Sequence, residues 1–113
     1  MFEKGDIVKL KIDKYKYEYP WITKYNRCYV IEYIDKDQYY LEGCNQVFDK
    51  FMFEYPSNPV MVSVVEYDGN QLYSSIVDNE DDLRYEIDIC RDMITPYNKI
   101  LVDNGKEIKV IKK

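Results

Sequence analysis

CYVIEYIDKDQYYLEG, residues 28–43, is the stretch of the sequence that decides the fold. A mostly apolar run at 28–34 leads into the polar turn 35–38, and a second apolar run follows at 39–43. Two strand-forming runs joined by a short polar turn indicate a β-hairpin.

Further strand signals lie on both sides of this hairpin. Residues 4–12 alternate apolar side chains with lysines after Gly5-Asp6, which predicts a half-buried strand. Residues 13–27 lack a clear period, so we expect a long loop there, with room for a short edge strand over 14–19. Two short apolar pieces follow, VF at 47–48 and FMF at 51–53. Four or five short strands in hairpin order favour a small closed barrel.

The succession KGDIVKL, long loop, CYVIEYID, YYLEG and FDKFMFE resembles the SH3-like small barrels of bacterial and phage proteins. The resemblance covers residues 2–55, so residues 1–55 are expected to form the first domain. It implies that Gly5-Asp6 lead the first strand and that Leu41 and Phe48 lie in the core. Such barrels serve as protein-binding, nucleic-acid-binding and inhibitory modules, so the resemblance implies an architecture and no single function.

The second half begins after Pro56 and Pro59, which interrupt regular structure. Residues 60–67 and 71–77 flank Asp-Gly-Asn and predict a second hairpin, and residues 99–103 and 106–111 flank Asn104-Gly105 and predict a third. We expect residues 59–113 to form a ββαββ segment, either separate from the barrel or packed with it as one compact unit. The expected fold class is therefore mainly β (α+β).

The α element of this segment is residues 79–95. Leu83, Ile87, Cys90 and Ile94 recur at helical spacing, the first turn is acidic, and a proline follows the end. A period of two through residues 83–89 is the competing strand pattern. The capping signals and the length favour the helix.

Composition excludes several classes of function. The chain has 113 residues, no histidine and three widely spaced cysteines, Cys28, Cys44 and Cys90. The missing histidine removes the commonest general base and the usual partner of a serine or cysteine nucleophile. The cysteines lack the spacing of a zinc site, so we expect buried, reduced thiols, no metal, no cofactor and no enzymatic activity.

No apolar run reaches the length of about 20 residues that spans a bilayer, and the charged start differs from a signal peptide. We therefore expect a cytoplasmic protein without a membrane partner. Exposed edge strands would allow a dimer.

An acidic cluster forms the first candidate surface. The net charge is −5, and the middle of the chain carries most of the excess acid. A calcium loop is disfavoured because Leu83 stands where that loop needs glycine. Carboxylates along an exposed helix would resemble DNA phosphates to a protein with a basic groove, whereas the plainer interpretation is a solvated helix face. The candidate residues are Asp78, Glu80, Asp81, Asp82, Glu86, Asp88 and Asp92.

A basic and aromatic stretch over residues 9–27 forms the second candidate surface. Cations that contact phosphates and rings that stack on bases are what binding of single-stranded nucleic acid requires. The same pattern also suits a protein contact, or an edge strand with its tyrosines packed inward. The candidate residues are Lys9, Lys11, Lys14, Lys16, Tyr17, Trp21, Lys24 and Arg27.

The first hypothesis is thus a non-enzymatic acidic binding protein. It would inhibit a host nucleic-acid-handling protein by DNA mimicry, in the manner of the anti-CRISPR viral proteins that phages or mobile elements carry. The alternative is an SH3-like nucleic-acid-binding accessory domain that uses the basic and aromatic stretch.

Overall fold

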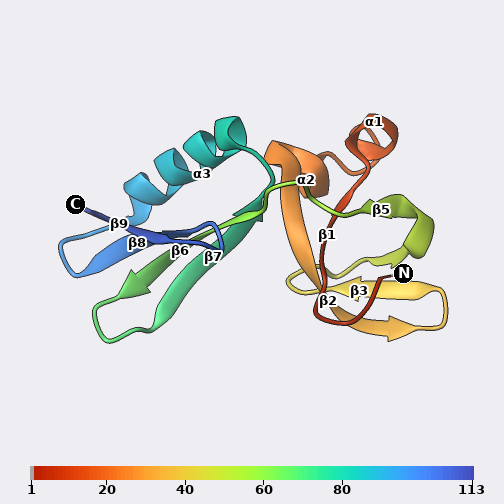
Figure 1. Cartoon of the computed structure of the whole chain (residues 1–113), viewed down its shortest axis with the longest axis horizontal. Coiled ribbons are helices and arrows are strands. Elements are labelled where there is room, and N and C mark those ends of the chain that lie inside the picture. The colour runs from red at the N-terminus through yellow and green to blue at the C-terminus, as the bar shows by residue number, and fades with distance from the viewer. Residues whose placement is uncertain (1) are drawn as a thin grey trace. The chain divides into compact units, whose positions relative to one another are not determined.

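The computed structural model describes residues 2–113, except for the side chains of Tyr25 and Glu80. The chain forms two compact units, Met1–Pro56 and Ser57–Lys113. Strands predominate in both, and one long helix lies in the second, so the expectation of a mainly β fold is confirmed. Figure 1 labels the helices and most of the strands of the two units.

Unit 1 is a run of short strands interrupted by single helical turns. Its elements are β1 (Ile7–Leu10), α1 (Ile12–Tyr15), α2 (Pro20–Thr23), η1 (Lys24–Asn26), β2 (Arg27–Asp35), β3 (Gln38–Leu41), β4 (Val47–Asp49), η2 (Lys50–Met52) and β5 (Phe53–Glu54).

The strands of unit 1 are antiparallel, in the order β4, β3, β2, β1, β5. Strand β1 divides its pairing: Ile7 and Val8 face β2, whereas Lys9 and Leu10 face β5. The first and last strands of the unit therefore lie side by side, although they are far apart in the sequence. This pairing is what brings the ends of the unit together.

The β2–β3 hairpin confirms the interpretation of residues 28–43. Its turn consists of Lys36 and Asp37 between the paired residues Asp35 and Gln38, and Lys36 adopts a positive φ of 59°. All five strands, β1 to β5, contribute side chains to the buried core of the unit. The core includes Leu41 and Phe48, as the resemblance implied. The buried members are Val8, Leu10, Ile31, Tyr39, Leu41, Phe48 and Phe53.

Residues 13–27 were expected to form a long loop, but most of them belong to two short helices and a 3-10 turn. The prediction of a short edge strand over 14–19 is therefore wrong. Backbone bonds typical of a helix run from the Tyr19 amide to the Tyr15 carbonyl (2.8 Å) and from the Thr23 amide to the Tyr19 carbonyl (3.1 Å). Pro20 occupies the first turn of α2, where its fixed φ and missing N–H are tolerated. Helices this short carry too few residues to show a period in the sequence.

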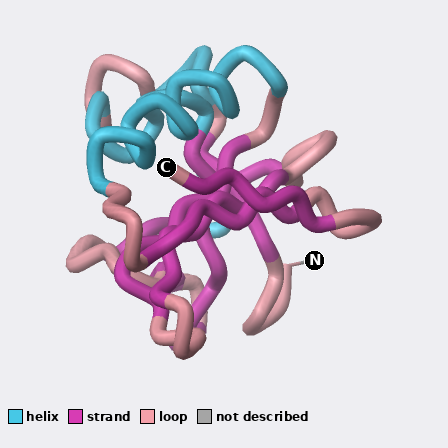
Figure 2. Tube along the Cα trace, turned by 90° about the vertical axis from the view of Figure 1, so that its left-hand side faces the viewer, coloured by secondary structure: helices cyan, strands magenta, loops and turns pink. Residues whose placement is uncertain are grey.

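Unit 2 has the expected order ββαββ. Its elements are β6 (Val60–Glu66), β7 (Gln71–Val77), α3 (Glu80–Met93), β8 (Asn98–Asp103) and β9 (Ile108–Lys112). The antiparallel strand order is β7, β6, β8, β9. Helix α3 lies along one face of this sheet, and Figure 2 shows it passing above the strands.

Helix α3 confirms the helical interpretation of residues 79–95. Asn79 caps it, because its side-chain oxygen accepts a hydrogen bond from the Asp82 amide (2.8 Å). The apolar face of the helix packs on a core of β6 and β8 side chains, with Cys90 and Ile94 buried and Leu83 and Ile87 at its margin. Packing of this face, more than intrinsic propensity, stabilises a helix of this length.

The C-terminal hairpin forms around Asn104-Gly105 as expected, but its loop is longer than a two-residue Asn-Gly turn. Asp103 pairs with Ile108, which leaves residues 104–107 in the loop. The Asn104 side chain accepts hydrogen bonds from the amides of Lys106 and Glu107, both at 2.9 Å. Gly105 has a φ of 87°, a conformation that favours glycine.

Candidate binding surfaces

The acidic residues chosen from the sequence do not form one exposed face. Asp81, Asp88 and Asp92 are exposed on α3 and Asp82 is half-buried, while the side chain of Glu80 lies outside the described part of the structure. Two other members, Asp78 and Glu86, are buried. The surface left is a sparse set of carboxylates.

The two buried carboxylates serve the interior of unit 2. Asp78 precedes the helix and accepts a hydrogen bond from the Asn58 amide (2.8 Å). Glu86 has no exposed surface, and its carboxylate accepts a hydrogen bond from the Tyr73 hydroxyl on β7. A buried carboxylate needs such partners, because desolvation penalises an isolated charge. These two residues therefore have a structural role, and the prediction that they belong to an exposed acidic face is wrong.

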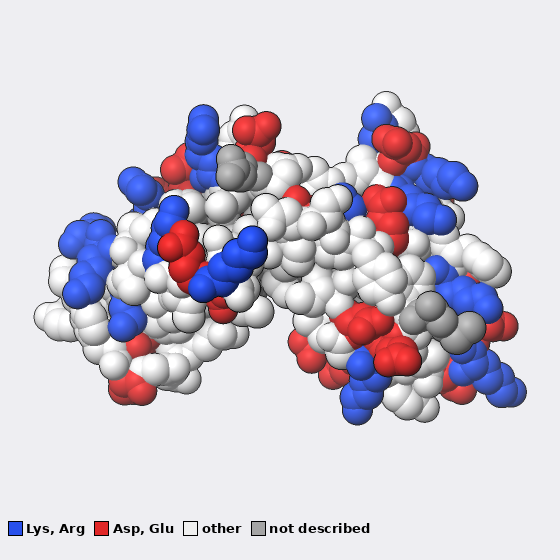
Figure 3. Space-filling model, in the orientation of Figure 1, with Lys and Arg blue, Asp and Glu red and all other residues white. Residues whose placement is uncertain are grey.

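The exposed side of α3 also carries cations. Arg84 and Arg91 are both exposed and lie seven residues apart, so they occupy similar angular positions on the helix. Figure 3 shows Lys and Arg side chains over α3 and β9. The charge of the segment as a whole therefore does not describe the charge of each helix face.

The basic and aromatic stretch retains an exposed part, which we call the basic-aromatic surface. It comprises Lys14, Lys16, Tyr17, Trp21 and Lys24, all exposed. Tyr17 is 87% and Trp21 74% exposed. The Lys16 ammonium lies 5.2 Å from the centre of the Tyr17 ring, and the Lys24 ammonium lies 5.3 Å from the centre of the Trp21 ring. Each ring therefore has a cation within about 6 Å, the usual range of a cation–π contact.

Three cations of the original candidate set lie elsewhere. Lys9 is on β1 and forms an ion pair with Glu54 on β5 at 3.8 Å. Lys11 precedes α1, and Arg27 begins β2; both are half-buried. These three side chains belong to the sheet and its margin.

Alternate aromatic residues of the same segment point inward and hold it in place. Tyr15, Tyr19 and Ile22 pack against the core of unit 1, and the Tyr19 and Phe48 ring centres are 5.5 Å apart. The Tyr29 hydroxyl on β2 donates a hydrogen bond to the Ile22 carbonyl (3.2 Å). Inward packing of the tyrosines is thus true of Tyr15 and Tyr19, whereas Tyr17 and Trp21 remain outside on a segment that the core anchors.

One exposed ring of unit 1 was missed from the sequence. Phe51 was expected in a short strand, but it lies in η2 and is 70% exposed. The Lys50 ammonium is 5.1 Å from its ring centre. The Lys11 amide donates a hydrogen bond to the Met52 carbonyl (3.0 Å), so η2 lies next to the start of α1. The signal was Asp49, whose side chain accepts from the Phe51 amide (3.0 Å) and begins the helical turn.

A tyrosine and a carboxylate interact near the two ends of unit 1. The Tyr55 hydroxyl donates a hydrogen bond to Asp6 Oδ2 at 2.9 Å. This bond, followed by desolvation and the nearby negative charge, raises the pKa of Tyr55 above the ordinary value for tyrosine.

The cysteines and the acidic residues offer no metal centre in the described part of the chain. Cys28 and Cys90 are buried as expected, but Cys44 is half-buried, and none of these three described residues is joined in a disulfide. Among residues 2–113, apart from the two side chains excluded above, no three His, Cys, Asp or Glu residues are grouped to hold a metal ion. The helices of the described residues include none that is both long enough and apolar enough to cross a membrane.

Comparisons of the chain with protein families, with curated proteins and with solved structures found no match. The function must therefore be argued from the surfaces themselves.

Proposed function

We propose that the protein is a non-enzymatic binding protein that contacts single-stranded nucleic acid through its basic-aromatic surface. The observation that carries the proposal is the exposure of Tyr17 and Trp21, each with a lysine ammonium beside the ring. A base can stack on each ring, and the adjacent ammonium is then placed to contact a phosphate of the same strand.

The anchoring of the segment supports this function. The inward side chains Tyr15, Tyr19 and Ile22 are packed against the core, so Tyr17 and Trp21 are presented on a supported backbone. A positioned ring loses less conformational entropy on binding than a ring on a free loop. Phe51, with Lys50 beside it, supplies a third ring and cation in the same unit.

We further propose that unit 1 is an SH3-like small barrel. In support, its strand order is β4, β3, β2, β1, β5, with a long connection after β1 and a 3-10 turn before β5. The long connection is the segment that holds the basic-aromatic surface.

The acidic hypothesis, an inhibitor that mimics DNA, has less support from the geometry. DNA mimicry needs carboxylates spread over an exposed face, and Asp78 and Glu86 are buried. Arg84 and Arg91 also interrupt the exposed carboxylates of α3. We therefore favour the basic-aromatic surface.

Fluorescence anisotropy with labelled dT20 and rU20 at low salt tests the proposal. Tyr17→Ala and Trp21→Ala should each weaken binding by about 1–3 kcal/mol through lost stacking. Replacing Lys14, Lys16 and Lys24 by Gln should make the negative slope of log K against log salt less steep by about two, since each phosphate contact contributes about −0.7.

Matched controls come from exposed residues elsewhere on the chain. Tyr97, which is 80% exposed in unit 2, is the aromatic control, and Lys4, Lys36 and Lys106 changed together to Gln match the charge change. These controls should bind like the unchanged protein. Failure to bind either oligonucleotide at low salt, or equal losses in both sets of variants, would refute the proposal.

A further inference from the structure

The sheet of unit 2 is wider than the helix that covers it. Four strands span about 19 Å at about 4.8 Å each, whereas one helix is about 10 Å across with its side chains. Helix α3 packs mainly on β6, β7 and β8. Beside it, toward the edge strand β9, lie two adjoining hollows that share Arg91. We call this depression the α3/β9 groove.

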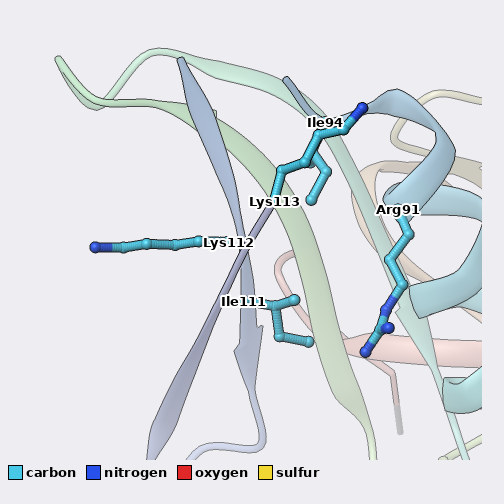
Figure 4. Close-up of a pocket in the computed structure, with 5 residues that line it drawn as sticks. All are labelled: Arg91, Ile94, Ile111, Lys112 and Lys113. Atoms are coloured by element: carbon cyan, nitrogen blue, oxygen red, sulfur yellow. The ribbon is translucent and has the colours of Figure 1, made fainter. Parts of the chain in front are cut away.

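The floor of the groove is aliphatic. Leu83, Ile87 and Ile94 line it from the helical side, and Ile111 lines it from β9. Leu83, Ile87 and Ile111 are partly buried side chains at the margin of the unit's core. Figure 4 shows the Ile111 and Arg91 side chains reaching toward each other across one of the hollows. The floor thus leaves part of its apolar surface in water.

The rim of the groove is cationic. Arg84 and Arg91 stand on α3, Lys109 on β9 and Lys113 after it. Asp88 is the carboxylate among the residues that line the two hollows. Lys112 also lines one hollow, but its side chain is directed away from the helix in Figure 4. In an acidic protein, this gathering of cations gives the groove a local charge opposite to the net charge.

We propose that the α3/β9 groove binds an acidic amphipathic segment of a partner protein, lying as a helix beside α3. Apolar side chains of such a segment would cover the aliphatic floor, and its carboxylates would meet the arginines and lysines of the rim. Nucleic acid suits this site less well, because the described residues that line the two hollows include no aromatic ring on which a base could stack. A purely ionic partner would leave the floor exposed.

The length of the groove sets the size of the segment. Helix α3 has 14 residues, about 21 Å at 1.5 Å per residue. A partner helix of similar length would place apolar side chains at i, i+3, i+4 and i+7 along the floor. This site is distinct from the basic-aromatic surface, so the inference goes beyond the proposed function and does not depend on it.

Selection from a random library of 16-residue peptides displayed on phage tests the inference, with the full-length chain as bait. The counter-selection bait carries Arg84→Glu, Arg91→Glu and Lys109→Glu, and circular dichroism confirms that it is folded. Enriched peptides should be acidic, with apolar residues at helical spacing. A labelled synthetic copy should bind the triple variant at least about tenfold more weakly, and added salt should also weaken its binding.

A control bait with Lys4→Glu, Lys36→Glu and Lys106→Glu has the same net charge change on exposed sites outside the groove. It should retain peptide binding, and amide shifts on peptide addition should map to residues 83–94 and 108–113. Three outcomes would overturn the inference: no enriched peptide, enriched peptides without acidic excess, or a chain that self-associates through the groove. Loss of oligonucleotide binding in the groove variant, with no peptide bound, would assign the groove to nucleic acid instead.

Discussion

The hydroxyl of Tyr73 on β7 donates a hydrogen bond to the carboxylate of Glu86 on α3, and Glu86 has no exposed surface. This contact joins the helix to an outer strand of the sheet of unit 2. Glu86 therefore belongs to the interior of unit 2 and does not contribute to the acidic surface of the helix.

Replacing Tyr73 by Phe should destabilise the protein by about 1–3 kcal/mol, because a buried carboxylate loses a hydrogen-bond donor. Urea unfolding followed by circular dichroism measures the change. Tyr97→Phe, on an exposed ring, is the control and should have almost no effect. If both substitutions cost the same, the Tyr73–Glu86 bond contributes nothing of its own.

Removing the cap of α3 should also weaken unit 2. Asn79→Ala removes the acceptor of the Asp82 amide and should cost about 1 kcal/mol, whereas Asn79→Asp keeps an acceptor oxygen and should cost less. Hydrogen exchange of the amides at 80–84 reports the loss locally. Faster exchange in the alanine variant alone is expected, and equal exchange in both variants would argue against the cap.

The raised pKa of Tyr55 has a defined effect on stability. The folded chain holds the phenol proton more tightly than the unfolded chain, because the hydroxyl donates to Asp6. The stabilising contribution is therefore complete below the ordinary tyrosine pKa of about 10 and is lost as the pH rises through the raised value. In an NMR titration of labelled tyrosine, Asp6→Asn should lower the pKa of Tyr55, and Asp13→Asn should not.

A cavity in the core of unit 1 should lower the stability of unit 1 before that of unit 2. Leu41 is almost fully buried, and Leu41→Ala should cost about 2–5 kcal/mol. Because the buried residues around Leu41 all belong to unit 1, amide protection should fall first in β1 to β5. Equal loss of protection in β6, β7, β8 and β9 would show that the two units unfold as one.

The hairpins could be predicted from the sequence because their signals are local. The turns at Lys36-Asp37 and at residues 67–70 each separate two apolar runs, and the structure has a strand on both sides of each turn. Segment 12–26 could not be predicted in the same way. Its helices have four residues each, which is close to a single helical turn, so tertiary packing of Tyr15, Tyr19 and Ile22 decides its shape.

The candidate surfaces were harder to predict, because net charge along a segment does not say which face carries it. Glu86 follows Leu83 by three residues and precedes Cys90 by four, a spacing that places it on the buried side of α3. Arg84 and Arg91 share another side by the same rule. The spacing of these residues thus indicates which side of the helix each one occupies, whereas the net charge of the segment does not. Which strand lies beside each helix face depends on the sheet order and could not be derived.

The split pairing of β1 has a consequence for the order in which the chain can fold during synthesis. Leu10 leaves the ribosome early, but its partner Phe53 on β5 is made only after almost all of unit 1. The β2–β3 hairpin can form while the chain is still growing, whereas β1 lacks one neighbour until the end of the unit emerges. Until then Lys9 and Leu10 present an unpaired strand edge, the kind of edge through which two nascent chains can pair.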